Sequence, residues 1–162
     1  RSGDSSRIAQ AFGDLKSKYA GTTQAGHAGL TLAKAMQDAG NASGAKDALV
    51  WVAEQSSDDG LKALAKLRLS SVLMEQKNYE EALKQGSGSF PSEFAPVVAD
   101  RMGDIFLLQD KRPDAIAEYT KAYKGFDGGT EYRRLVEIKL NALGVSPQGA
   151  AVVAATSSAE AK

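Results

Sequence analysis

The 162-residue chain contains no cysteine, one histidine, one tryptophan and four prolines. The absence of cysteine excludes a disulfide framework and a thiolate site. The single histidine, His27, has no cysteine or second histidine at metal-ligating spacing, so a zinc site is not expected. No run of 18 apolar residues occurs, and therefore no stretch of this chain reads as a membrane span.

An excess of charge of either sign is also absent, since 20 Lys and Arg residues balance 20 Asp and Glu residues. This balance gives no reason to expect binding to nucleic acid or to an anionic membrane surface. No secretory signal sequence is recognisable. The chain begins with "RSGDSS", and residues 1–4 are expected to be an expression scar or a linker.

Catalytic patterns are missing as well. The pair Asp58–Asp59 stands where a helix is expected to begin, and there acidic residues favour the helix dipole rather than acid–base chemistry. Ser70 and Ser71 have no base nearby in the pattern, and the glycines at 125, 128 and 129 match no phosphate-binding loop. The sequence therefore predicts no catalytic, cofactor-binding or metal-binding residue, and a protein that is not an enzyme.

What the sequence does contain is a spacing that recurs. In "RMGDIFLLQDKRPDAIAEYTKAY" (101–123), Ala115 follows Gly103 by 12 residues. Ser70 and Ala82 repeat this interval in "KLRLSSVLMEQKNYEEALKQG" (66–86), as do Ala33 and Ala45 in "LTLAKAMQDAGNASGAKDALVWV" (30–52). The second alanines lie 37 and then 33 residues apart, close to the period of about 34 that is typical of tetratricopeptide repeats.

A pair of closely crossing antiparallel helices explains the spacing. One helix needs a small residue where the other carries alanine, and a large side chain fills the space before the next pair. No pair buries its apolar face alone, so stacking of pairs completes the core. The competing explanation is chance similarity within an alanine-rich helical chain. The expected structural residues of the repeats are Ala33, Ala45, Ser70, Ala82, Gly103, Ala115, Tyr119 and Ala122.

The predicted fold is all-α, with about three helical-hairpin repeats stacked as a right-handed solenoid and flanked by terminal helices. Periodicity and breakers place seven to eight helices within a repeat domain over residues 5–143. The expected helices are 5–19, 25–38, 42–55, 60–76, 79–85, 93–108, 113–123 and 130–143. The repeats cover about 25–55, 60–86 and 93–124, a capping helix covers 130–143, and the alanine- and serine-rich segment 144–162 is expected to be disordered.

Stacks of this kind bind through a concave face formed by the first helix of each pair. Projection of that face gives a hypothetical partner-binding groove with an apolar strip and charges at one end. Its residues are Leu64, Leu67, Ser71, Met74, Val97, Asp100, Arg101 and Asp104, with His27, Leu30, Lys34, Gln37, Glu75 and Leu107 on the same face. The strip either accepts an apolar segment of a partner or is filled by a terminal helix of the chain itself, and the sequence leaves both alternatives open.

Three segments resemble one particular family. They are "LRLSSVLMEQKNYEEAL" (67–83), "FAPVVADRMGDIFLLQDKRPDAIAEY" (94–119) and "RLVEIKLNALG" (134–144), of which "VADRMGD" is the most specific. Over residues 8–144 the chain resembles the YfgM-like proteins, ancillary subunits of the bacterial Sec translocon. The stretch "KQGSGSFPSEF" (84–94) departs from that family in having less helix and more glycine and serine.

The resemblance implies a periplasmic domain held at the bacterial inner membrane by a single N-terminal transmembrane helix that is absent from this chain. It implies partners that are proteins, namely the Sec translocon and the periplasmic chaperone PpiD, and a role in passing translocated chains to chaperones. No cofactor is implied. The alternative function is a repeat-containing assembly or scaffold factor of outer-membrane or secretion machinery, and a third class is an enzyme or small-ligand sensor.

Overall fold

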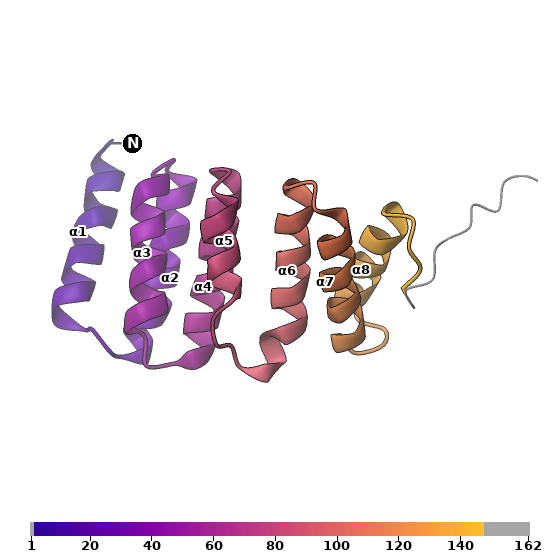
Figure 1. Cartoon of the computed structure of the whole chain (residues 1–162). Coiled ribbons are helices and arrows are strands. Elements are labelled where there is room, and N and C mark those ends of the chain that lie inside the picture. Colours follow the sequence, from indigo (N-terminus) through magenta and orange to yellow (C-terminus); the bar gives the residue numbers. More distant parts are fainter. Residues whose placement is uncertain (1, 148–162) are drawn as a thin grey trace, which may run out of the picture. The chain divides into compact units, whose positions relative to one another are not determined.

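The computed structural model describes residues 2–147, with side chains from residue 6 onward, and this part of the chain is helical without an extended strand. The all-α fold class predicted from the sequence is therefore confirmed. Figure 1 shows the elements, which are α1 (Ser2–Lys18), α2 (Thr23–Asp38), α3 (Ala42–Gln55), α4 (Asp59–Glu75), α5 (Tyr79–Gly86), the 3₁₀ turn η1 (Ser92–Phe94), α6 (Ala95–Leu108), α7 (Arg112–Gly125) and α8 (Glu131–Ala142).

The chain divides into two compact units. Unit 1 is Arg1–Phe94 and contains α1 to α5, and unit 2 is Ala95–Lys162 and contains α6 to α8. The pairs α2–α3 and α4–α5 in unit 1 and the pair α6–α7 in unit 2 are helical hairpins. We call α2, α4 and α6 the first helices and α3, α5 and α7 the second helices.

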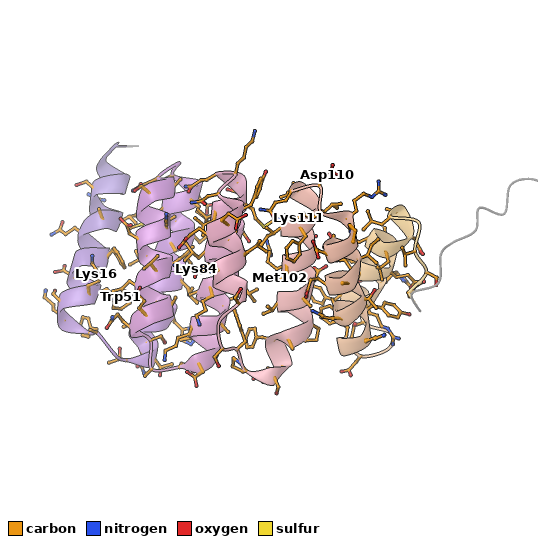
Figure 2. All side chains as sticks on the ribbon, viewed as in Figure 1. Lys16, Trp51, Lys84, Met102, Asp110 and Lys111 are labelled. Atoms are coloured by element: carbon orange, nitrogen blue, oxygen red, sulfur yellow. The ribbon has the colours of Figure 1, made fainter. Side chains whose placement is uncertain are left out.

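The turns inside the three hairpins have the same backbone conformation. Gly40, Lys77 and Asp110 each adopt a positive φ, of 77°, 59° and 60° respectively. In each turn the next backbone N–H donates to the carbonyl five residues earlier, over 2.8 Å for Asn41 to Met36, 2.8 Å for Asn78 to Leu73 and 2.9 Å for Lys111 to Phe106. This is the Schellman ending of a helix, and it starts every second helix at the same register. Asp110 and Lys111 are labelled at the turn of unit 2 in Figure 2.

That register places the recurring alanine at the crossing of each hairpin. Ala45, Ala82 and Ala115, each five residues after the left-handed residue, have no exposed surface. In the second hairpin, Ser70 donates from its hydroxyl to the Ala82 carbonyl over 3.2 Å. In the third, a Cβ added to Gly103 would lie 2.6 Å from Cδ1 and Cε1 of Tyr119, so only glycine leaves room for that ring. Ala33, Tyr119 and Ala122 are also buried.

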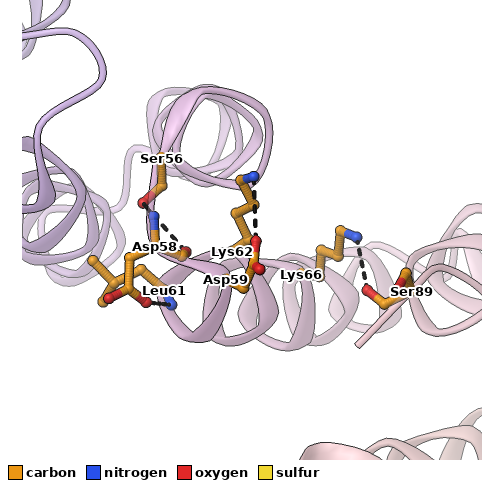
Figure 3. A network of polar contacts seen from close by, with 7 residues as sticks. All are labelled: Ser56, Asp58, Asp59, Leu61, Lys62, Lys66 and Ser89. Atoms are coloured by element: carbon orange, nitrogen blue, oxygen red, sulfur yellow. Dashed lines mark hydrogen bonds and ion pairs between the residues drawn. The ribbon is translucent and has the colours of Figure 1, made fainter. Parts of the chain in front are cut away.

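Side-chain caps fix where several helices begin. The Ala25 N–H donates to Thr22 Oγ1 over 3.1 Å, and the Gly44 N–H donates to Asn41 Oδ1 over 2.9 Å. Figure 3 shows the start of α4, where the Leu61 N–H donates to Asp58 Oδ1 over 2.9 Å. Each cap satisfies one backbone donor that the first turn of a helix leaves without a partner.

The second hairpin differs from the other two because its second helix is short. Helix α5 has 8 residues, whereas α3 and α7 have 14 each. The glycine- and serine-rich segment after it lies against α4, where Lys66 Nζ donates to the Ser89 carbonyl over 3.4 Å (Figure 3). Lys66 Nζ also lies 5.2 Å from the centre of the Phe90 ring. The boundary between the two units follows directly after this segment.

Helix α8 ends with a further Schellman turn. Gly144 has a φ of 77°, and the Val145 N–H donates to the Leu140 carbonyl over 3.1 Å. The segment 144–162, which the sequence predicts to be disordered, is described only as far as residue 147. Residues 148–162 lie outside the described part, so that prediction stays a prediction.

Candidate functional site

An open hollow of about 470 Å³ lies between the two first helices of unit 1. Its floor is apolar, and charged or polar side chains stand around it. The lining residues are His27, Leu30, Thr31, Lys34, Ala35 and Asp38 from α2, and Leu61, Leu64 and Arg68 from α4. We call this hollow the α2–α4 groove. Four of its residues, His27, Leu30, Lys34 and Leu64, are ones that projection of the repeat places on the first-helix face.

The polar groups of the α2–α4 groove come mainly from three side chains. Lys34 Nζ pairs with Asp38 across one turn of α2 over 3.3 Å, and both side chains are mostly exposed to solvent. Arg68 crosses from α4, and its Nη1 donates to the Leu30 backbone carbonyl over 3.5 Å, a length at which a hydrogen bond is weak. Arg68 has no ion pair with a carboxylate in the described part of the chain, so no carboxylate of the chain compensates its charge in this groove.

The other unit 1 residues of the predicted groove are less accessible than expected. Leu67 is only 7% exposed and therefore belongs to the packed interior. Ser71 is half-buried, and its hydroxyl donates to the Leu67 carbonyl over 3.2 Å within α4. Met74 and Leu64 are also half-buried. Leu64 is thus the member of this strip that lines the α2–α4 groove.

In unit 2, two acidic residues of the predicted groove are already paired. Lys139 of α8 donates from Nζ to Asp100 Oδ1 and to Asp104 Oδ1, both over 2.7 Å. Tyr119 donates from its hydroxyl to the same Asp104 oxygen over 2.7 Å, and Lys139 Nζ lies 5.2 Å from the centre of the Tyr119 ring. These four residues form what we call the Lys139 network. Val97 and Arg101, also on α6, are half-buried.

Burial sets the protonation behaviour of the Lys139 network. Desolvation raises the pKa of the Asp100 carboxyl above its usual value, although the hydrogen bond and the charge of Lys139 act in the opposite direction. Desolvation, and then the hydrogen bond to Asp104, raise the pKa of the Tyr119 hydroxyl far above its usual value. Tyr119 therefore stays a neutral donor in its hydrogen bond to Asp104.

Sequence reasoning missed Arg68 and Lys139, which decide the chemistry of the two sites. The signal was present in the pattern "LAKLRL" (64–69), which returns as "LVEIKL" (135–140) with a basic residue at the same place. Reasoning also missed that α8 exposes Tyr132, Leu135 and Ile138, each more than half accessible in unit 2.

Two further residues, Trp51 and Asp58, contribute to packing and to helix capping. Trp51 of α3, labelled in Figure 2, packs edge-on against Phe12 of α1, with ring centres 5.9 Å apart. Asp58 caps α4, as its position predicted. Within the described residues, no group of three or more His, Cys, Asp or Glu side chains is placed to hold a metal ion. No helix in that part has the length and apolar character to cross a bilayer.

Comparison with known proteins adds three findings. A family model described as a tetratricopeptide repeat-like domain matches residues 1–145. The chain is similar to a protein named "Ancillary SecYEG translocon subunit" from Neisseria gonorrhoeae (strain ATCC 700825 / FA 1090), with 30% identity over 138 residues. The match covers 85% of this chain, and the chain spans 66% of that relative's length. No solved structure gives a significant match.

Proposed function

Because the chain belongs to the tetratricopeptide repeat-like family, we propose that it is a non-catalytic protein-interaction module that serves as an ancillary subunit of the bacterial Sec translocon. The name of the relative supports the translocon as partner, and the family supports binding of proteins. The finer parts of the proposal are a periplasmic location at the inner membrane, and transfer of translocated chains to a periplasmic chaperone such as PpiD.

The observation that carries the proposal is the α2–α4 groove. Its apolar floor is formed by Leu30, Leu61 and Leu64, and its rim carries Lys34, Asp38 and Arg68. An apolar hollow with a few convergent polar groups is the usual form of a binding site. Its place between two first helices is where repeat stacks bind extended or helical segments of other proteins.

The partner-binding residues are proposed separately for each unit. In unit 1 they are Leu64 and the neighbouring Arg68, with Ser71 and Met74 farther along α4. Leu67 is better treated as a packing residue, because a charged substitution there would disturb the interior before it altered a surface. In unit 2 we retain Val97, Asp100, Arg101 and Asp104 as proposed contacts, although a partner would meet Asp100 and Asp104 with Lys139 already bound to them.

Site-specific photo-crosslinking tests the proposal. A photoreactive amino acid replaces Leu64 in the protein in its native membrane, and a matched variant carries it at Asp47, an exposed residue of the second helix α3. The expected result is crosslinks to translocon subunits or to a chain in transit from position 64, and far fewer from position 47. Equal crosslinking from both positions, or none from position 64, would contradict the proposal.

A further inference from the structure

Helices α4 and α8 each send one basic side chain toward an earlier first helix of their own unit. Arg68 reaches the Leu30 carbonyl of α2, and Lys139 reaches Asp100 and Asp104 of α6. The two basic residues hold the same place in the matching stretches "LAKLRL" and "LVEIKL", 71 residues apart. They are equivalent residues of the repeat.

The positions that face these basic residues are also equivalent. Counted from the small residue of each hairpin, Asp100 and Asp104 stand three before and one after Gly103. The residues three before and one after Ala33 are Leu30 and Lys34. Unit 2 therefore supplies two carboxylates to its basic residue, whereas unit 1 supplies a leucine and a second cation.

Because unit 1 has no carboxylate at these positions, the positive charge of Arg68 in the α2–α4 groove is not paired. Its one acidic lining residue, Asp38, pairs with Lys34. Arg68 is half-buried beside the apolar floor, where a guanidinium gains most from a planar, bidentate carboxylate partner. The lining thus combines one uncompensated positive charge with Leu30, Leu61 and Leu64.

From this arrangement we infer that the α2–α4 groove selects polypeptide segments in which an acidic side chain neighbours large apolar side chains. The carboxylate of the segment pairs with Arg68, as Asp100 and Asp104 pair with Lys139, and its apolar side chains occupy the leucine floor. The inference rests on the proposed function and names the class of partner for the same groove. We assign the carboxylate to an Asp or Glu side chain, because the equivalent basic residue of unit 2, Lys139, holds two aspartate side chains.

The test measures fluorescence anisotropy with three labelled peptides of equal length. The first alternates Leu and Glu and has an amidated C-terminus, the second replaces every Glu by Gln, and the third is the Gln peptide with a free C-terminal carboxylate. The proteins are the wild-type chain, Arg68→Gln, Arg68→Lys, and the matched control Arg112→Gln, which alters an exposed arginine at the start of α7. Circular dichroism checks that each variant is folded.

The wild-type chain is expected to bind the Glu peptide at least about tenfold more tightly than the Gln peptide, as follows from a hydrogen bond between charged groups. Arg68→Gln removes that preference, and Arg112→Gln retains it fully. Arg68→Lys keeps part of it, because the positive charge remains but the two parallel N–H donors of the guanidinium are lost. A complementary variant, Arg68→Glu, is expected to prefer a peptide that alternates Leu and Lys.

Several results would overturn the inference. They are equal affinity of the wild-type chain for the Glu and Gln peptides, a Glu preference that survives Arg68→Gln, absence of binding to every peptide, and an Arg68-dependent gain for the free C-terminus alone. The proposed function fails independently, when position 64 does not crosslink to the translocon or to a chain in transit. Crosslinking from position 64 without any Glu preference would leave the function standing and remove only the charge selectivity.

Discussion

The first-helix face of unit 1 and that of unit 2 are built on the same backbone plan and differ in two side chains. In unit 2, Lys139 binds Asp100 and Asp104 over 2.7 Å, and Tyr119 adds a third hydrogen bond, to Asp104. In unit 1, the equivalent Arg68 meets only a backbone carbonyl over 3.5 Å. The chain itself therefore pairs the basic residue on the unit 2 face, whereas the unit 1 face presents a cation beside an apolar hollow.

In both units the repeat directs a basic side chain to the same place on the preceding first helix. The residues that it meets there differ between the units. The hairpin turns at Gly40, Lys77 and Asp110 have the same conformation in both units, so the backbone does not distinguish the two faces. Under the function proposed above, two residues on the preceding first helix decide whether the cation is paired within the fold, as in unit 2, or is left for a ligand, as in unit 1.

The largest loss of stability in unit 2 is expected from a side chain that fills the space occupied by Tyr119. In Gly103→Leu, the added side chain starts 2.6 Å from the ring of Tyr119, so the ring and its bond to Asp104 must move. We expect a loss of about 1–3 kcal/mol in the free energy of unfolding, typical of overpacking. Urea denaturation measures it. Gly13→Leu is the control, because a Cβ there meets nothing within 4 Å, and equal losses in both variants would refute the close packing at Gly103.

The next test removes each basic side chain in turn. Lys139→Met leaves Asp100 and Asp104 beside each other without a cation, and because both are only partly buried we expect a loss of about 1–2 kcal/mol, below the 3–5 kcal/mol of a fully buried pair. Arg68→Met is expected to change stability by less than about 0.5 kcal/mol, as for an ordinary surface substitution. Equal losses in the two variants would mean that Arg68 is a structural residue and that the contrast between the units is wrong.

Most of the fold can be predicted from the sequence, because the small residues at helix crossings and the polar turns recur once in each hairpin. The 12-residue spacing of Ser70 and Ala82 predicts a helix crossing, and the structure joins these two residues by a hydrogen bond. Helix ends are harder to predict. The position of η1 and the start of α6 depend on the conformation of the segment that follows the short helix α5. The recurring spacing predicts the tetratricopeptide repeat, and the match to the family model confirms it. The segment "VADRMGD" and its neighbours carry the resemblance to the YfgM-like proteins, which the matched relative supports.

The candidate site was harder to predict because it depends on side chains that cross between helices. Projection of the first helices placed Leu64 and Leu67 on one face, but only the packed structure shows that Leu67 is buried. The same projection treated Asp100 and Asp104 as charges for orienting a partner. It could not show that Lys139, 35 residues beyond Asp104, lies within hydrogen-bond distance of both.

A smaller effect is expected in how the stability of unit 2 depends on pH through Asp100. Because burial raises the pKa of Asp100 in the folded protein, the folded state binds its proton more readily than the unfolded state does. Asp100 therefore contributes stability that is fully present below its unfolded pKa and is lost as the pH rises through the folded pKa. Asp100→Asn lacks this dependence, so its stability relative to the wild-type protein should rise as the pH rises through that window and then level off.

The measurement is urea denaturation of both proteins over a series of pH values, with the difference plotted against pH so that other carboxylates cancel. Asp38→Asn in unit 1 is the control for the loss of a carboxylate that is exposed on α2. A stability difference for Asp100→Asn that falls with rising pH would mean that Lys139 outweighs burial at this site.

The smallest expected effects concern the turns, where the two units should behave alike. Lys77 in unit 1 and Asp110 in unit 2 hold positive φ values, which cost an L-residue about 1–2 kcal/mol, whereas glycine adopts them freely. Glycine also makes the unfolded chain more flexible, at a cost of about 0.4–1 kcal/mol, so the net gain of Lys77→Gly should be about 0.5 kcal/mol. Asp110→Gly should gain less, because aspartate tolerates this conformation better than lysine does. Melting temperatures measure both changes, with Gly40→Ala as the reversed control that should lower stability. If Lys77→Gly gained and Asp110→Gly lost stability by similar amounts, the turns would not be equivalent, and the difference between the two faces would extend to the backbone that carries them.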